Sequence, residues 1–162
     1  MIINRQRGVR VPVRELDKFL SLALRHLRVS PQSLSVCLVE NAEIARWNRS
    51  YRGKKGPTDV LSFPTYGARG RKHKQARNLR SRERFFSAGF LSSTSAASYM
   101  GDIAIAPAVA RRNARRFGRT FPDEMRILIL HGILHLMGYD HETDDGEMDR
   151  REHRLRRELR LA

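Results

Sequence analysis

Apolar side chains along this chain follow two different spacings. Recurrence at intervals of three and four residues, typical of a helix with one buried face, predicts helices near 12–27, 41–51, 107–117, 122–137 and 144–159. Short apolar or β-branched runs at 2–4, 34–39, 60–63 and 101–106 predict strands. The chain is therefore expected to mix helices and strands along its length.

The helix predicted at 122–137 differs from the others because it is apolar on nearly every side. A helix of this kind is usually buried at the centre of a fold. Pro122, Asp123 and Glu124 favour its start, and Gly138 favours its end. We expect this helix to be the central, buried one.

Capping residues suggest where two other helices begin. Asn41 is predicted to be the N-cap of one helix. Asp144 and Glu147 have the spacing of a capping box for the last helix, whose inner stripe is Met148, Leu155 and Leu159.

Residues 66 to about 99 interrupt these patterns. Between Arg69 and Arg84 lie eight basic residues and one acid, Glu83, and a Ser-rich stretch follows at 92–98. Low hydrophobicity and like charges favour a mobile segment. We interpret it as an insertion within a single domain, 1–162; the alternative is an ordinary exposed loop without a role.

Charge is the strongest feature of the composition. The chain has 32 Lys+Arg against 17 Asp+Glu, a net charge of +15, and most of the cations are Arg, whose planar guanidinium suits phosphate groups. A field of this sign attracts polyanions, so RNA or DNA is the expected partner. General solubility and an anionic membrane surface are the alternatives.

Cellular location is constrained by what the sequence lacks. Cys37 is the single cysteine, which excludes an intramolecular disulfide and fits a reducing compartment. No apolar run approaches the roughly 18 residues of a membrane span, and no signal peptide is recognisable. We expect a cytoplasmic protein without a membrane partner.

Three histidines at close spacing predict a metal site. His131 and His135 are four residues apart on the predicted central helix, so their rings share one face. A turn at Gly138 would bring His141 back to the same point. Three neutral imidazoles suit zinc and leave a fourth tetrahedral position for water, so we predict one Zn²⁺ per chain.

Metzincin proteases have the same histidine spacing but differ at one position. They carry Glu directly after the first histidine as the general base. Here that position is Gly132, which has no side chain, so peptide hydrolysis by this route is disfavoured. Asp140 and Glu142 flank His141 and are candidates to replace that base, although support of a histidine is the commoner role.

The segment 131–141, HGILHLMGYDH, resembles the signature of the YbeY-type endoribonucleases, which mature ribosomal RNA. Segments 48–52 (NRSYR), 57–64 (PTDVLSFP) and 101–103 (GDI) resemble the same family in the same order. The resemblance covers the chain from about residue 34 onward except the basic insertion, which is longer than is usual in the family.

This resemblance implies an α+β fold, in which a small mixed β-sheet is flanked by helices and a central buried helix carries the zinc ligands. It implies a zinc-dependent, single-strand-specific endoribonuclease that acts on small-subunit ribosomal RNA, especially the 3′ end of 16S. The functional arginine of the family corresponds to Arg52, with a solvated surface arginine as the alternative. Expected partners are the 16S precursor and the small ribosomal subunit, with ribosomal proteins or a ribosome-assembly GTPase as further candidates, in rRNA processing and ribosome quality control.

Several residues keep two interpretations. Tyr51 and Tyr139 are suited either to base stacking or to core packing, whereas Asp59 and Ser62 favour structural roles and Cys37 inert packing.

At the level of the whole protein, two alternatives to the endoribonuclease remain. One is a ribosome-associated RNA-binding factor with a mainly structural zinc, and the other is a metalloprotease, which Gly132 disfavours.

Overall fold

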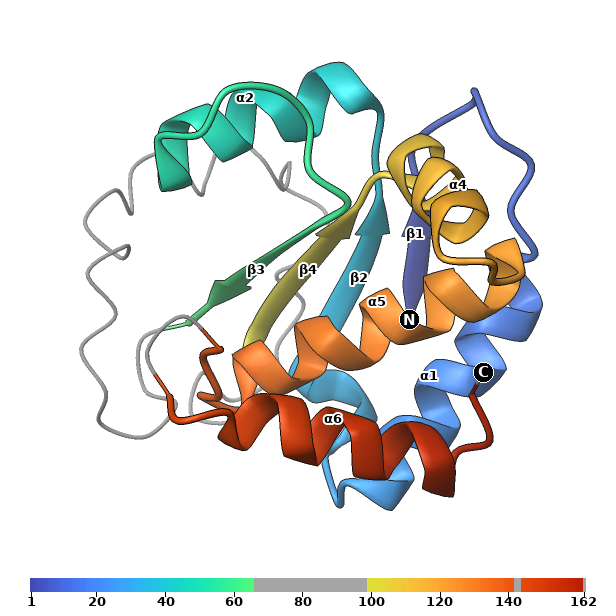
Figure 1. The fold of residues 1–162 in the computed structure, drawn as a ribbon, viewed down its shortest axis with the longest axis vertical. Helices are drawn as coiled ribbons and strands as arrows, with labels where there is room; N and C mark the ends of the chain where they lie inside the picture. Colours follow the sequence, from blue (N-terminus) through green and yellow to red (C-terminus); the bar gives the residue numbers. More distant parts are fainter. Residues whose placement is uncertain (66–98, 142–143, 162) are drawn as a thin grey trace.

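The computed structural model describes residues 1–65, 99–141 and 144–161 (Figure 1). The basic cluster of the predicted insertion lies outside the described residues. The elements follow in the order β1 (Ile2–Asn4), α1 (Val13–His26), a short 3₁₀ helix (Pro31–Ser33), β2 (Leu34–Leu38), α2 (Asn41–Arg52), β3 (Val60–Pro64), β4 (Gly101–Ile105), α4 (Pro107–Arg116), α5 (Phe121–Leu136) and α6 (Glu147–Glu158).

Four strands form one mixed sheet in the order β1-β2-β4-β3. The pairs β1–β2 and β2–β4 are parallel, and β3 is antiparallel to β4, with Leu61 opposite Ala104. This mixed sheet with flanking helices confirms the predicted α+β class. The edge strand β3 lies between α2, whose Tyr51 packs on Phe63, and α5, whose Gly132 carbonyl accepts a hydrogen bond from Ser62.

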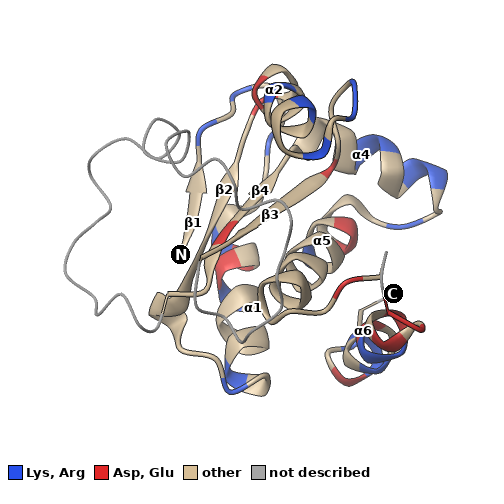
Figure 2. Cartoon of the chain, turned by 90° about the vertical axis from the view of Figure 1, so that its left-hand side faces the viewer, with Lys and Arg blue, Asp and Glu red and all other residues tan. Residues whose placement is uncertain are grey.

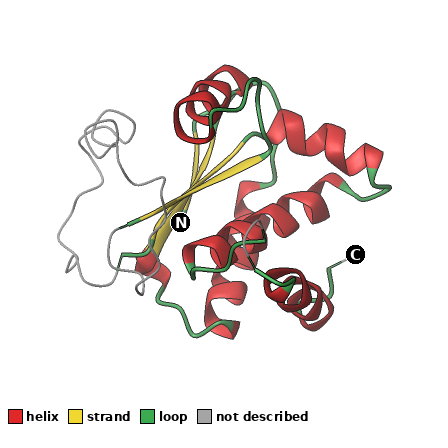
Figure 3. Ribbon diagram, turned by 60° about the vertical axis from the view of Figure 1, so that its left-hand side comes forward, coloured by secondary structure: helices red, strands yellow, loops and turns green. Residues whose placement is uncertain are grey.

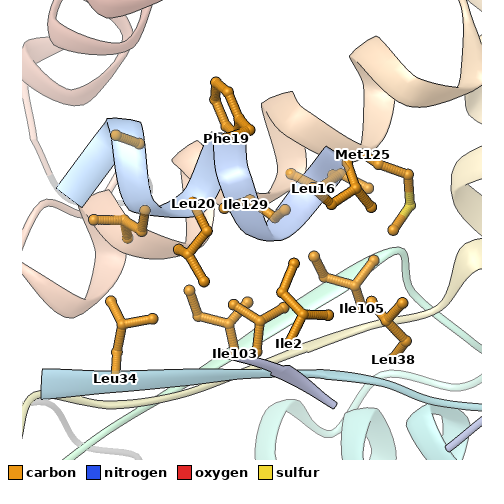
Figure 4. Packing of buried hydrophobic residues seen from close by; sticks show 14 of the residues in the cluster. Ile2, Leu16, Phe19, Leu20, Leu34, Leu38, Ile103, Ile105, Met125 and Ile129 are labelled. Carbon is orange, nitrogen blue, oxygen red and sulfur yellow. The ribbon is translucent and has the colours of Figure 1, made fainter. Parts of the chain in front are cut away.

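The two faces of the sheet are covered by different helices (Figure 3). Alternate residues of a strand point to opposite faces, so Leu34, Val36 and Leu38 of β2 pack with α1 and α5, as Figure 4 shows in part. Cys37 lies on the other face, in a second cluster with Trp47 of α2. Burial of each large apolar side chain favours the folded state by about 1.5–3 kcal/mol, and these two clusters contain most of the core.

Helix α5 is the central, buried helix that the sequence predicts. One side packs on the sheet, where Ile129 and Ile133 are fully buried. Its other side packs on α6 through Leu130 and Leu134, which contact Met148 and Leu155. Helix α5 therefore lies between the sheet and α6, and side chains from both neighbours can reach it.

Both capping predictions are wrong in detail. Asn41 is the first helical residue of α2, and Glu40 is the N-cap. Gly146, at φ 78°, is the N-cap of α6, so Glu147 is the first residue of the helix and no capping box forms. Asp144 still closes this end, because its carboxylate accepts hydrogen bonds of 2.9 Å from the backbone N–H groups of Gly146 and Met148.

Within the described ranges, every helix is too short or too polar to cross a bilayer.

Candidate metal centre

The three predicted ligands, His131, His135 and His141, lie together at the C-terminal end of α5. The ring centroids of His131 and His135 are 4.7 Å apart, and that of His141 is 5.3 Å and 5.2 Å from them. One ring nitrogen from each histidine can be chosen so that all three lie within 4.8 Å of one another. The structure therefore brings together the three residues that the sequence assigned to a metal.

The turn after α5 brings His141 back. Gly138 has a φ of 94°, a conformation that residues with a Cβ rarely adopt. The backbone N–H of Tyr139 donates to the carbonyl of Leu134 over 3.1 Å, which closes the turn. The sharp turn predicted at Gly138 is thereby confirmed.

Hydrogen bonds to Nδ1 fix the direction of two of the rings. Nδ1 of His131 donates to the Glu152 carboxylate over 2.8 Å, and Nδ1 of His135 donates to the carbonyl of Tyr139 over 3.0 Å. When both rings are neutral, these bonds leave each Nε2 unprotonated, and the two Nε2 atoms lie 3.1 Å apart. That separation is close to the roughly 3.3 Å between two corners of a tetrahedron whose Zn–N bonds are about 2.0–2.1 Å. The donor set fits a zinc-like cation.

Glu152 of α6 is the residue that sequence reasoning missed. Its side chain is buried, and its second carboxylate oxygen accepts a charge-assisted hydrogen bond from Arg156. Burial alone raises the pKa of Glu152, but the hydrogen bonds and charges of His131 and Arg156 outweigh this and lower it. Glu152 is therefore ionised at neutral pH and available to hold the His131 ring.

The protonation of His135 also suits a ligand. Burial, followed by the charges of His131 and His141, lowers the pKa of His135 to about 4. The ring is therefore neutral at physiological pH, and neutral imidazole is the form that coordinates metal ions.

Gly132 is required by the packing of α5 on β4. A Cβ at this position would lie 2.7 Å from Cγ2 of Ile103, closer than real side chains approach. The carbonyl of Gly132 accepts a 3.3 Å hydrogen bond from the Ser62 hydroxyl of β3. Any side chain at position 132 would have to displace Ile103, and with glycine here the usual base of the metalloprotease alternative is absent.

The site is open on the side of His141. His131 and His135 are half-buried, whereas His141 is exposed. Asp140 is half-buried beside it, and Glu142 lies outside the described residues. The histidine cluster therefore combines fixed donors on α5 with a solvent-accessible side, where a substrate can approach.

Arg52 is the last residue of α2 and is half-buried. The preceding residue, Tyr51, packs on Phe63 of β3 with ring centroids 5.1 Å apart. Ser62, next to Phe63, points to the opposite face and contacts Gly132. The helix that ends at Arg52 and the helix that carries the histidines thus flank the same edge strand.

The remaining candidates take structural positions. Asp59 accepts a 2.9 Å hydrogen bond from Asn113 and so ties the start of β3 to α4. Tyr51 contacts Phe63, and Tyr139 packs against the cluster between α5 and α6. Cys37 is buried, and burial raises its pKa to about 11, which fits inert packing.

Comparisons with known proteins agree with this arrangement. A family model described as Endoribonuclease YbeY matches residues 1–160. A protein of Koribacter versatilis named Endoribonuclease YbeY is 34% identical over 161 residues, which are 99% of this chain and 86% of that protein. One of the same name from Sulfurovum is 30% identical over 159 residues, 98% and 90% of the two chains. A solution structure from Thermotoga maritima matches with a TM-score of 0.55 and 28% identity, covering 98% of this chain and 89% of that one.

Proposed function

Because this chain belongs to the YbeY family of endoribonucleases and is an RNA-cleaving hydrolase, we propose that it cleaves single-stranded RNA at a zinc ion held by His131, His135 and His141. The observation that carries the proposal is the convergence of three imidazoles with one solvent-exposed side. A structural zinc is normally enclosed by four protein ligands, whereas a catalytic zinc keeps a position for water or substrate.

The residues around the ion have separate tasks. Glu152 holds His131 and the Tyr139 carbonyl holds His135, so both Nε2 atoms stay directed at one point. A zinc ion bound there supplies Lewis acidity, which stabilises negative charge on a phosphate oxygen or lowers the pKa of a bound water. The half-buried side chains and the turn at Gly138 keep the donors fixed during the reaction.

Arg52 is proposed as the catalytic cation that contacts the scissile phosphate. Phosphodiester cleavage concentrates negative charge on the non-bridging oxygens, and a guanidinium offers them two parallel N–H donors. Support comes from its place in the family motif at 48–52 and from the shared contact of its helix and the histidine helix with β3.

The proposed substrate is ribosomal RNA, with maturation of the 16S 3′ end and ribosome quality control as the processes. Family membership and the net charge of +15 support an RNA substrate. The proposed setting is the small ribosomal subunit in the cytoplasm, with ribosomal proteins or a ribosome-assembly GTPase as further partners.

A ribosome-associated binding factor with a structural zinc is the competing function. His141→Ala separates the two, because this exposed ligand contributes little to the core. We expect it to lose zinc by elemental analysis and to lose RNA cleavage, while its circular dichroism spectrum and melting transition persist. His153→Ala, an exposed histidine of α6, is the control and should retain all three properties. Unfolding of His141→Ala, or cleavage by a zinc-free variant, would contradict a catalytic zinc.

Arg52 is tested in the zinc-loaded protein. Arg52→Ala should retain zinc and fold but slow cleavage by about 10²–10³-fold, the usual effect of losing one donor to a developing charge. Arg49→Ala, an exposed arginine of the same helix, controls for charge. Each protein is purified in parallel with a variant lacking all three histidines, which reports contaminating nuclease. Equal rates for Arg52→Ala and Arg49→Ala would remove Arg52 from the mechanism.

A further inference from the structure

The turn after α4 exposes an aromatic ring. Phe117 is 53% exposed, the most exposed large apolar side chain in the described part of the chain. Gly118, at φ 65°, turns the chain directly after it. Single exposed apolar side chains are common on protein surfaces, so the surroundings of this ring decide whether it marks a binding site.

Two guanidinium groups lie over this ring. The Cζ atoms of Arg116 and Arg119 are 5.6 Å and 5.1 Å from the ring centroid of Phe117. Arg119 is fixed in this position, because its Nη1 donates to the buried Glu124 carboxylate over 2.9 Å. The result is an aromatic ring that remains 53% exposed next to two cations, one of which is anchored to the core.

Helix α4 extends this cationic surface. Its sequence contains four arginines and no acid, and Arg112, Arg115 and Arg116 are exposed. None of these three forms an ion pair with another described residue. Figure 2 shows Lys and Arg along the outer side of α4. The positive charge of this helix is therefore available to an external anion.

The surface lies well away from the histidines. Phe117 precedes the start of α5, whereas His131 lies ten residues after its first residue, Phe121. At about 1.5 Å per residue, these two positions of the helix are roughly 15 Å apart. A strand stacked at about 3.4 Å per nucleotide covers that distance with roughly four or five nucleotides.

We propose that Phe117 and the α4 arginines Arg112, Arg115 and Arg116 form a second contact for the single-stranded RNA substrate. One unpaired base stacks on Phe117, and the neighbouring phosphates pair with the arginines. RNA is the partner chosen because α4 carries four arginines and no acid, a charge that suits a polyanion, and because a neighbouring aromatic ring offers a base a surface to stack on. The inference rests on the proposed RNA-cleaving function, because it extends the path of the bound RNA strand from the proposed zinc centre to α4.

The test compares equilibrium binding of two lengths of RNA. Zinc-loaded protein is titrated against fluorescent single-stranded RNA of about 4 and about 16 nucleotides, and gels check that the RNA stays intact. Phe117→Ala should weaken binding of the longer RNA by about 5- to 100-fold and leave the shorter unchanged. Phe117→Trp should retain affinity, since a larger ring still stacks. Leu22→Ala, another exposed apolar residue, is the control.

The arginines are tested through salt dependence. Arg115→Gln should flatten the slope of log affinity against log salt for the longer RNA by about 0.7. Lys18→Gln, an exposed cation of α1, should leave it unchanged.

Three results would overturn the proposal. The first is unchanged affinity of Phe117→Ala for the longer RNA. The second is an equal loss of affinity for both lengths of RNA. The third is weaker binding of Phe117→Ala to small ribosomal subunits with unchanged affinity for RNA, a result that would identify a protein contact. Cleavage is assayed separately, so a failure of the zinc mechanism leaves this binding result interpretable.

Discussion

Oε2 of Glu152 lies 2.8 Å from Nδ1 of His131, across the interface between α6 and α5. The bond joins a proposed metal ligand to a helix that begins sixteen residues later in the chain. Arg156, one turn further along α6, holds the other oxygen of the same carboxylate. We therefore expect metal affinity and the docking of α6 to be coupled through this one side chain.

Removing this carboxylate should weaken zinc binding without abolishing the fold. Partners that hold a metal-bound histidine typically contribute 10- to 100-fold in affinity, so we expect a loss of this size for Glu152→Ala. Glu152→Gln, which can still accept the His131 hydrogen bond, should lose less. Competition with a zinc chelator measures the affinities. Glu158→Gln, which alters the half-exposed pair with His26 on the same helix, is the control. Equal zinc affinity in all four proteins would show that Glu152 does not position the ligand.

A methyl group at position 132 should destabilise the protein. Gly→Ala within a helix ordinarily stabilises by about 1 kcal/mol, but here the Cβ would meet the Ile103 side chain, and overpacking typically costs about 1–3 kcal/mol. Urea unfolding should give a net loss for Gly132→Ala. Gly8→Ala, where the nearest atom is 3.6 Å away, should be close to neutral.

The clash is assigned by a double-mutant cycle. Ile103→Ala removes the three atoms nearest to the new Cβ, so Gly132→Ala should cost less in that background than in the wild type. The same cost in both backgrounds would place the strain elsewhere.

Cys37 should resist alkylation in the folded protein. Burial, opposed in part by Arg5, raises the pKa of its thiol to about 11, so little reactive thiolate exists near pH 8. Iodoacetamide should react slowly with native protein and rapidly in urea. Similar rates in both states would contradict the burial.

The raised Cys37 pKa also makes the free energy of unfolding depend on pH. The folded state holds the thiol proton more tightly than the unfolded state, so this contribution is complete below the unfolded pKa. It declines as pH rises from about 9 toward 11. Cys37→Ala should therefore lose less stability than the wild type over that interval, as measured by urea unfolding at each pH. Parallel curves would refute this linkage.

The basic cluster of residues 69–84 should strengthen RNA binding and leave the chemistry unchanged. Each phosphate contact on a single strand adds about 0.7 to the salt slope, and eight cations need not make eight contacts. Replacing the eight basic residues by Gln should flatten the slope by a few units, with little change in the rate at saturating RNA. Gln at the same positions keeps the chain length constant. An unchanged slope would mean that this cluster does not contact RNA.

Local sequence relationships account for the parts of the site that could be predicted. His131 and His135 are one turn apart on α5, and Gly138 follows the end of that helix, so spacing alone indicated the shared face of the two histidines and the return of His141. Glu152 depends on how α6 docks against α5, which no local spacing specifies. A signal was nevertheless present, because Glu152 falls on the buried stripe of Met148, Leu155 and Leu159, where an acid requires a partner.

The fold was predictable for a similar reason, and its prediction was incomplete in similar places. Apolar periodicity located the helices and strands, because burial of one face determines it. The caps at Glu40 and Gly146 were missed, since backbone conformation and distant contacts selected them over the favoured Asn41 and Asp144. The ion pair of Arg119 is a similar case. Its partner, the Glu124 carboxylate, belongs to α5, which begins at Phe121, so the contact depends on how that helix is placed.

The packing of Gly132 on Ile103 also limits how this lineage can evolve. A descendant that acquired an acid at position 132 would have the histidine spacing and the base used by metzincins, but its side chain would meet Ile103. A smaller residue at position 103 would relieve that clash, yet taken alone this change removes buried atoms from the core and gives no new activity. Either order of the two substitutions therefore passes through a less stable protein, which selection opposes.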